Sequence, residues 1–395
     1  MTFSLKRRTL LKAALAGAGF AALGSAGIPA VATAARRLAP RGPKVVIVRF
    51  GGGVRRRETI DPSHSFSPYL LHELAPRGTL FRNVEIASEQ GIDTSHGQGT
   101  LNVLIGRYAH YRDVRDRVLG DRFEPEHPTL FEYLRRSRSI PAHQTLLVNG
   151  EDRSDEEFYT FSNHADYGAP WRASVLSLYR FKCHVLRRQL QEERFADGER
   201  EQKQRELAKL EALDHRDRSV AGQGPEIEAF WDRWRGHFGD SGLVNARGDR
   251  LLTELAIRAL AELRPRLMMI NYNDPDYVHW GNPAHYTRGI AVIDEGLRRL
   301  VGAIESDPFY RGDTVVAIVP DCGRDDNRFM AVPFQHHFNS RSSREIFALL
   351  LGPGIARGQV VARRVEQIAL TPTLGNLMRI PTPHCDASPL AEALA

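Results

Sequence analysis

Acidic and histidine side chains collect beside three apolar runs of this chain, and they are residue types that bind metal ions. The runs are 266–270, 314–319 and 346–351, each short and mostly aliphatic. The first two runs are followed, and the third is preceded, by the candidate ligands Asp274, Asp276, His279, Asp321, His336 and His337. Taken alone, Asp321 could simply cap the next turn. Because ligands collect at the carboxyl ends of strands in open α/β sheets, the repeated pattern favours a metal site assembled from loops.

A second set of candidate residues lies where small and hydroxyl-bearing side chains precede a helical-looking run, 100–105. Free backbone N–H groups at a helix N-terminus stabilise a nucleophile or an oxyanion. The candidate nucleophiles are Ser95, Thr94, His96 and Thr100. The alternative is that Thr94 or Ser95 only caps the helix.

A glycine run, 51–53, follows the first predicted strand, 45–50, and three arginines begin at Arg55. Consecutive glycines let backbone N–H groups converge on an anion, and the guanidinium fork binds tetrahedral oxyanions bidentately. We therefore predict anion binding by Gly52 and Arg55, with Arg324 as a further candidate. The alternative for the glycine run is a tight exit from the strand.

Helix and strand patterns alternate along most of the chain. An amphipathic helix at 251–263 leads into the strand at 266–270, and another helix follows at 290–304. This alternation predicts an α/β fold with a mostly parallel central sheet and helices on both faces. Residues 150–245 differ, because 187–213 carries Glu, Arg and Lys at helical spacing, which predicts a long solvated helix. We interpret this region as a helical insertion or cap.

The chain begins with a twin-arginine pattern, Arg7 and Arg8, followed by a stretch rich in Ala and Gly and by small residues near Ala34. This pattern predicts an export signal at 1–34 that the twin-arginine translocase reads. The mature protein, 35–395, would then be periplasmic or secreted. The alternative is an uncleaved membrane anchor; no later stretch is long and apolar enough to span a bilayer.

The charge balance gives no reason to expect nucleic-acid binding. The predicted signal carries four of the 54 basic residues, which leaves 50 against 48 acidic residues in the mature chain. The three cysteines, Cys183, Cys322 and Cys385, are too few and too scattered for a disulfide framework, although one pair could form outside the cytoplasm.

The order of these motifs resembles the alkaline phosphatase superfamily, which includes sulfatases, nucleotide phosphodiesterases and cofactor-independent phosphoglycerate mutases. The resemblance covers roughly 45–110 and 265–380 and leaves the middle of the chain unmatched. The similar stretches are the Asp…His metal loop at 273–281, the Asp-His-Gly motif at 320–324, the closing strand at 345–354 and the Pro-Thr-Leu helix at 365–374.

The chain departs from the family pattern at its metal ligands. Glycines 51–53 stand where the family has a metal-binding Asp, and Cys322 replaces the His of Asp-His-Gly. Asp276 and His279 are one residue closer together than usual, which leaves Asp274 as an alternative ligand.

The family's nucleophile also has no clear counterpart. Its usual slot lies ten residues before the glycine that matches Gly106, and His96 occupies it. A gap of one residue would give Ser95, which we favour over Thr94, His96 and Thr100.

The resemblance implies a metal-dependent hydrolase of phosphate or sulfate esters, and the predicted signal implies that it is exported. A hydroxyl at 94–95 would attack the phosphorus or sulfur, and metal-activated water would release the product. Zinc is the expected metal, with manganese and calcium as alternatives. The rival hypothesis is a catalytically silent member of the same fold that binds anions or acts as a scaffold.

The resemblance also assigns the ligands. Asp276, His279 and one of His336 and His337 would hold one metal. Asp321 would belong to a second metal that has lost two ligands, unless Cys322 binds it as a thiolate; the alternative is a buried, inert cysteine. We therefore predict one metal per chain, with Arg55, Arg56 and Arg324 supplying positive charge in place of the second.

Overall fold

The computed structural model describes residues 42–88, 92–108, 112–113, 123–150, 159–192, 195–196, 198–211, 224–240, 248–279, 282–326, 334–336 and 338–395. The predicted export signal and His337 lie outside these described residues. Within the described part of the chain, no helix is both long and apolar enough to cross a membrane.

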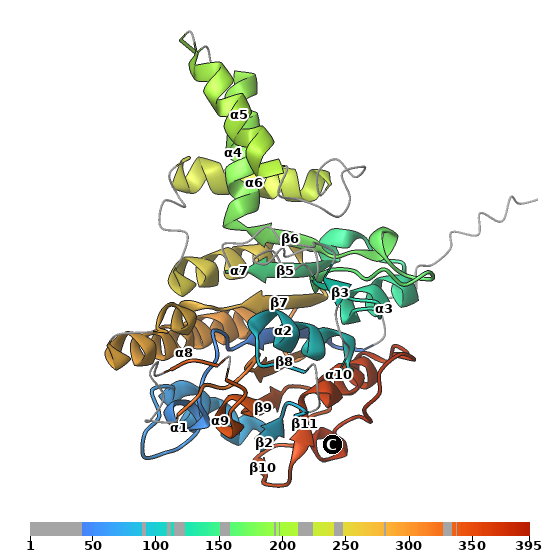
Figure 1. The fold of residues 1–395 in the computed structure, drawn as a ribbon. Helices are drawn as coiled ribbons and strands as arrows, with labels where there is room; N and C mark the ends of the chain where they lie inside the picture. Colours follow the sequence, from blue (N-terminus) through green and yellow to red (C-terminus); the bar gives the residue numbers. More distant parts are fainter. Residues whose placement is uncertain are drawn as a thin grey trace, which may run out of the picture. The chain divides into compact units, whose positions relative to one another are not determined.

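A nine-stranded sheet forms the centre of the structure (Figure 1). Its strands are β1 (Lys44–Arg49), β2 (Gly78–Glu85), β5 (Thr145–Asn149), β6 (Ser174–Ser177), β7 (Leu267–Asn271), β8 (Thr314–Val319), β9 (Glu345–Leu351), β10 (Gln359–Val361) and β11 (Val365–Glu366). The order is β10-β2-β9-β8-β1-β7-β5-β6, and β11 pairs with β2. Strand β9 runs antiparallel to β2 and β8, and the other described pairings within this sheet are parallel. The predicted mostly parallel α/β sheet is confirmed.

Helices cover both faces of this sheet. On one face α7 (Asp249–Leu263) and α8 (Pro283–Ser306) join the apolar cluster that contains Val46 and Val48. On the other face lie α2 (His96–Ile105), α3 (Leu130–Arg138) and α10 (Leu370–Met378), which join the cluster that contains Val45 and Ile47. Alternate residues of β1 therefore serve opposite faces, as the pleat of a strand requires.

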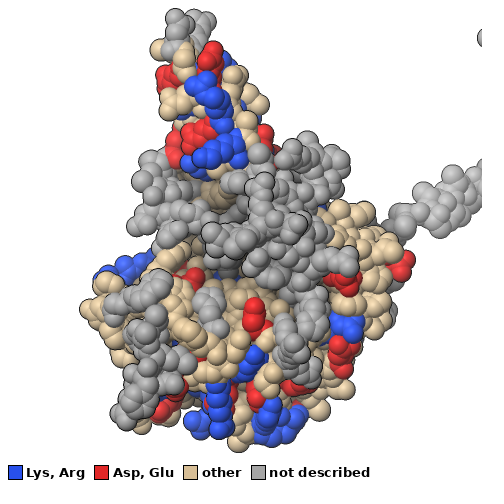
Figure 2. All heavy atoms as spheres, viewed as in Figure 1, with Lys and Arg blue, Asp and Glu red and all other residues tan. Residues whose placement is uncertain are grey.

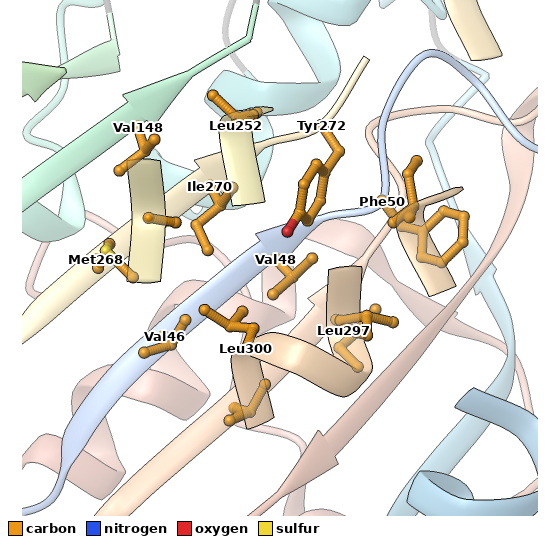
Figure 3. Packing of buried hydrophobic residues seen from close by; sticks show 14 of the residues in the cluster. Val46, Val48, Phe50, Val148, Leu252, Met268, Ile270, Tyr272, Leu297 and Leu300 are labelled. Carbon is orange, nitrogen blue, oxygen red and sulfur yellow. The ribbon is translucent and has the colours of Figure 1, made fainter. Parts of the chain in front are cut away.

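Figure 3 shows the first of these clusters from close by. Residues of three strands and two helices pack together there: Val46, Val48, Val148, Met268, Ile270, Leu252, Leu297 and Leu300. Burial of the sheet on both faces explains why its central strands are continuous apolar runs, without the alternation of a half-exposed strand.

Several short elements complete the described chain. They are the paired strands β3 (Arg112–Asp113) and β4 (Phe123–Glu124), the helices α1 (Arg56–Thr59) and α9 (Arg341–Arg344), and the π-helical or 3-10 turns η1 (Tyr69–Leu74), η2 (Ala75–Arg77), η3 (Ala142–Gln144), η5 (Ala169–Trp171), η6 (Asp274–Tyr277), η7 (Gln367–Ala369) and η8 (Ala391–Ala393).

The middle of the chain contributes one edge strand, β6, and three helices: α4 (Leu178–Glu192), α5 (Glu199–Glu211) and α6 (Pro225–Phe238). Helix α6 buries Trp231 and Trp234 in the first apolar cluster. Helix α5 has no fully buried residue and packs on α4 beside ion pairs such as Arg187–Glu211. Figure 2 shows basic and acidic side chains interspersed over these two helices, which fits a solvated surface.

The prediction of one long helix at 187–213 is wrong, because the structure forms two helices there. Helix α4 ends at Glu192, and α5 begins at Glu199. Gly198 lies between them with a φ of 85°, a left-handed value that interrupts a right-handed helix.

Candidate metal centre

Three neighbouring strands deliver the candidate side chains to one edge of the sheet. The order β8-β1-β7 places the carboxyl ends of these parallel strands side by side. Asp321 follows β8, while Asp276 and His279 follow β7. Arg49 is the last residue of β1, so its side chain belongs to the same edge.

Helix α2 brings His96 to these strand ends. Gly99 lies in its first turn, where a Cβ would stand only 2.0 Å from the backbone oxygen of Asp321. The Oγ of Ser95 accepts a hydrogen bond from the backbone N–H of Gln98 at 3.3 Å and caps the helix. The close approach and the cap together fix His96 beside the carboxylates.

His96 lies between two aspartates. Its Nδ1 is 2.7 Å from Asp321 Oδ2, and its Nε2 is 2.6 Å from Asp276 Oδ1. Only 7% of the residue is exposed. Burial alone would lower the pKa of His96, but the charges of the two aspartates outweigh burial and raise that pKa well above its ordinary value.

Two more imidazoles converge on the same oxygen of Asp276. The Nε2 of His279 lies 3.0 Å from Asp276 Oδ1, and the Nε2 of His336 lies 3.6 Å from it. Burial opposes ionisation of Asp276, yet the surrounding histidines dominate and lower its pKa far below the ordinary value. Asp276 therefore stays a carboxylate surrounded by three Nε2 atoms.

The opposite ring nitrogen of each histidine faces a hydrogen-bond acceptor. Nδ1 of His336 is 2.8 Å from the backbone oxygen of Thr94, and Nδ1 of His279 is 3.0 Å from Gln335 Oε1. For His96 the acceptor is Asp321. Metal-bound histidines characteristically donate their second ring N–H in this way, which fixes the ring and leaves the other nitrogen for the metal. His96, Asp276 and His336 thus form a candidate metal group of two nitrogens and one carboxylate. His279 lies beside this group through its contact with Asp276.

The other candidate metal group is poorer. His96, Asp321 and Cys322 lie close together, with Cys322 Sγ 3.8 Å from His96 Nδ1. Burial raises the pKa of the Cys322 thiol to about 12, so a metal ion would have to displace the thiol proton in order to bind there. Asp321 Oδ1 already accepts the backbone N–H groups of Cys322 at 2.8 Å and Gly53 at 3.3 Å.

Arg49 belongs to this site, although the sequence analysis missed it. The side chain is fully buried, and its Nη1 lies 3.4 Å from Asp321 Oδ2. Nη1 also donates to Thr100 Oγ1 at 2.9 Å, and Nη2 donates to the backbone oxygen of Tyr272 at 3.2 Å. A charged residue inside the apolar run Val-Val-Ile-Val-Arg-Phe was the available signal, because buried charges need partners.

Each predicted hydroxyl nucleophile has a hydrogen-bond partner within the protein. Thr94 is buried, and its hydroxyl donates to the backbone oxygen of His336. The Ser95 hydroxyl caps α2, and the Thr100 hydroxyl accepts from Arg49. Of the four candidates in this segment, the structure places His96 at the centre of the carboxylate cluster.

Arg324 has a structural role in place of the predicted anion-binding role. Its side chain is fully buried. All five guanidinium N–H groups donate to backbone oxygens, those of Gly52, Gly53, Pro275, Val278 and Phe334. No donor is left for an anion. Arg324 instead ties together the glycine run after β1, the loop after β7 that carries Asp276 and His279, and the segment that precedes His336.

The other predicted anion-binding residues are also held by protein partners. Arg55 donates bidentately to Glu58, at 2.7 and 2.8 Å. Arg56 pairs with Glu345. Gly52 has a φ of 82°, and a Cβ there would lie 2.4 Å from the backbone nitrogen of Asp276. The glycine run thus permits close packing against the loop after β7.

Asp274 lies in a different contact from Asp276. Its Oδ1 accepts from the backbone N–H of Asp249 at 3.1 Å, and the Asp249 carboxylate accepts in return from the backbone of Asn273 and Asp274. This reciprocal arrangement pins the loop after β7 to the start of α7. Of the two carboxylates in that loop, Asp276 is the one that the structure places among the histidines.

The sequence matches no protein-family model and no curated protein. Solved structures do match the fold. Ps i-CgsB in complex with k-i-k-neocarrahexaose matches with a TM-score of 0.54 and 12% identity, over 88% of this chain and 75% of that chain. The phosphonate monoester hydrolase of Agrobacterium radiobacter matches with a TM-score of 0.51 and 14% identity, over 89% and 77%.

Wild-type alkaline phosphatase PafA also matches, with a TM-score of 0.51 and 11% identity, over 90% of this chain and all of that chain. At these identities the likeness concerns the fold. This chain has the fold of these structures, one of which is named as an alkaline phosphatase.

Proposed function

We propose that this protein hydrolyses phosphate or sulfate esters with one divalent metal ion held by His96, Asp276, His279 and His336. The observation that carries the proposal is the convergence of three Nε2 atoms on one oxygen of Asp276, with each Nδ1 facing an acceptor. Two matched structures are named as an alkaline phosphatase and a phosphonate monoester hydrolase, which supports the class of reaction.

Zinc suits this set of ligands best. Zinc accepts imidazole and carboxylate ligands, and manganese is the alternative. Calcium prefers six to eight oxygen ligands, so three imidazoles argue against it. When bound, the metal would polarise an ester oxygen and lower the pKa of a water molecule.

The protein's own groups hold this centre and balance its charge. Asp321 accepts from Nδ1 of His96, which aims Nε2 toward Asp276. The buried guanidinium of Arg49 lies 3.4 Å from Asp321, and that of Arg324 lies 3.9 Å from Asp276. These positive charges offset the repulsion between the two carboxylates and an anionic ester. With a divalent metal bound, the centre would have an excess of positive charge, which would draw tetrahedral anions to this edge of the sheet.

Water is the attacking group in this proposal, in place of a hydroxyl at 94–95. The hydroxyls of Thr94 and Ser95 are committed to a backbone oxygen and to the helix cap. A water oxygen forms the new bond to phosphorus or sulfur, the bond to the ester oxygen breaks, and the water proton leaves with the alcohol. The silent, anion-binding alternative is not favoured, because the structure brings the ligand side chains together and leaves Arg324 no donor for an anion.

The test is turnover of three substrates by purified protein loaded with zinc or manganese: p-nitrophenyl phosphate, bis-p-nitrophenyl phosphate and p-nitrophenyl sulfate. We expect hydrolysis of at least one, and its loss when a chelator removes the metal. The variant His279→Ala should lose both metal and turnover, whereas His285→Ala, an exposed histidine on α8, should lose neither. Absence of turnover in metal-loaded protein with all three substrates would reject the proposal.

Export is a second part of the proposed function. The pair Arg7 and Arg8 and the apolar stretch behind them support delivery by the twin-arginine translocase to the periplasm or beyond. That route carries folded proteins, so the metal could be bound before export. No nucleic acid is among the proposed partners.

A further inference from the structure

Arg49 places a buried positive charge at the carboxyl end of β1. A site that binds more than one metal ion would be expected to have negatively charged side chains there. Arg49 and Asp321 are both fully buried, and their charged groups are 3.4 Å apart. Burying a charge costs several kcal/mol unless it is paired. Arg49 therefore has a specific electrostatic task at this edge of the sheet.

The charges of the site leave room for one divalent ion. The carboxylates of Asp276 and Asp321 are matched by the guanidiniums of Arg49 and Arg324, which lie 3.4 Å and 3.9 Å from them. One divalent ion would give this cluster an excess of two positive charges, and a second ion would double that excess. Closely spaced like charges in a poorly solvated site repel strongly.

We propose that Arg49 takes the place of a second metal ion, so that Asp321 positions His96 and does not ligate metal. The inference rests on the proposed metal site at Asp276, and it assigns the neighbouring group of His96, Asp321 and Cys322 to the metal-free half.

The contacts of Asp321 support this role. Oδ2 faces both His96 Nδ1, at 2.7 Å, and Arg49 Nη1, at 3.4 Å. Oδ1 accepts from two backbone N–H groups, those of Cys322 and Gly53. Both oxygens are thus occupied by protein donors, and a metal would have to displace at least one of them. A carboxylate that holds the second nitrogen of a ligand histidine is a recognised support for a metal site.

Arg49 is itself fixed from two directions. Thr100 on α2 and the backbone oxygen of Tyr272 after β7 accept from its guanidinium. A Cβ on Gly51 would lie 2.9 Å from Arg49 Nε, so the chain is close on that side too. The guanidinium cannot swing away to admit an ion without breaking these contacts.

Cobalt-loaded protein provides the test, because a thiolate bound to cobalt gives a strong charge-transfer absorption. Elemental analysis of the wild-type protein should find one cobalt per chain, with no such absorption. Asp321→Asn should still bind one cobalt per chain, about 10–100-fold more weakly, as expected for a residue that orients a ligand. Cys322→Ala should leave stoichiometry and spectrum unchanged, as should the control Cys385→Ala.

Arg49→Met tests the guanidinium directly. If it folds, it should admit a second cobalt and gain a thiolate absorption that the further change Cys322→Ala removes. A folded Arg49→Met protein that still binds one cobalt overturns the role given to Arg49. If the Arg49→Met protein does not fold, the wild-type and Asp321→Asn proteins still test the inference. Two cobalt ions per wild-type chain would overturn it, and so would the loss of one of two cobalt ions in Asp321→Asn.

Failure of this inference is distinguishable from failure of the proposed function. One cobalt per chain without thiolate absorption, in a protein that hydrolyses no ester, supports the role of Arg49 and rejects the hydrolase. Two metal ions per chain in an active enzyme support the hydrolase and reject the role of Arg49. A wild-type protein that binds no metal rejects both.

Discussion

His96 connects the two carboxylates of the site, and in the proposed metal site a proton on His96 competes with the metal. In the metal-free protein the pKa of His96 lies well above its ordinary value, opposed by burial but raised by Asp276 and Asp321. A ligand histidine must be deprotonated at the nitrogen that binds, so the metal has to displace a proton.

Metal uptake should therefore release protons. Because raising the pH removes the competing proton, affinity should rise with pH by about tenfold per unit between roughly pH 6 and the raised pKa of His96. Calorimetric titration in two buffers of different ionisation enthalpy measures the number of protons released. An affinity that does not change over this range would show that His96 is neutral before the metal binds or is no ligand.

Ser95→Ala separates the helix cap from a nucleophile. With the hydroxyl only capping α2, the variant should keep its turnover and lose about 1 kcal/mol of the free energy of unfolding. Denaturant unfolding and steady-state turnover of the metal-loaded variant measure the two effects. A loss of turnover by several orders of magnitude in a folded variant would restore Ser95 as the nucleophile.

At the residue scale the sequence named the side chains that the structure brings together: Asp276, His279, Asp321, His336 and His96. The sequence could indicate them because they follow apolar strands. Fold stability alone seldom requires His or Asp at such a position. Arg49 was missed and Arg324 was misjudged, because a guanidinium's partners depend on which backbone oxygens the fold leaves nearby. Sequence spacing does not contain that information.

At the scale of elements, α2 depends on a glycine where it touches the end of β8. A methyl group at Gly99 would meet the backbone of Asp321 at 2.0 Å, and backbone cannot yield as a flexible side chain would. Gly99→Ala should lower the free energy of unfolding by about 1–3 kcal/mol and weaken metal binding, because His96 moves with the helix.

Gly302→Ala is the matched control for this change. Gly302 also lies inside a helix, α8, but a Cβ there would meet nothing within 4 Å. Replacing that glycine should leave stability unchanged or raise it by up to about 1 kcal/mol. Thermal unfolding and metal titration of both variants distinguish steric contact from helix propensity. Equal effects at the two positions would contradict the importance of the α2 contact.

The sequence predicted some elements and not others, and the physical interactions that form each element explain the difference. The central strands β1, β7 and β8 were visible because burial on both faces makes them continuous apolar runs. The antiparallel direction of β9 was not, since hydrophobic periodicity carries no direction. The break between α4 and α5 includes Gly198, at a left-handed φ of 85°, in a charged stretch where the spacing of Glu and Arg remains helical on both sides.

At the scale of the whole molecule, the site exists because strands distant in sequence are neighbours in the sheet. Strand β1 lies between β7 and β8, which begin more than 200 residues later. The motif order suggested this arrangement through the resemblance to a known family, and the structure confirms the fold. The 150–245 region contributes an edge strand as well as helices, which the sequence did not indicate because β6 is only four residues long.

The export prediction also concerns the whole molecule, because a translocase that carries folded proteins must receive the sheet and its metal site already assembled. The signal is read as a pair of arginines, so replacing Arg7 and Arg8 with lysine keeps the charge and removes the recognised group. We expect the double variant to remain as precursor in the cytoplasm, folded and loaded with metal.

A second arginine pair, Arg36 and Arg37, follows the predicted cleavage site near Ala34 and provides the control. Its replacement with lysine should leave delivery unchanged. Fractionation with immunodetection measures precursor and mature protein in each compartment, and normal delivery of the Arg7→Lys, Arg8→Lys protein would reject the twin-arginine route.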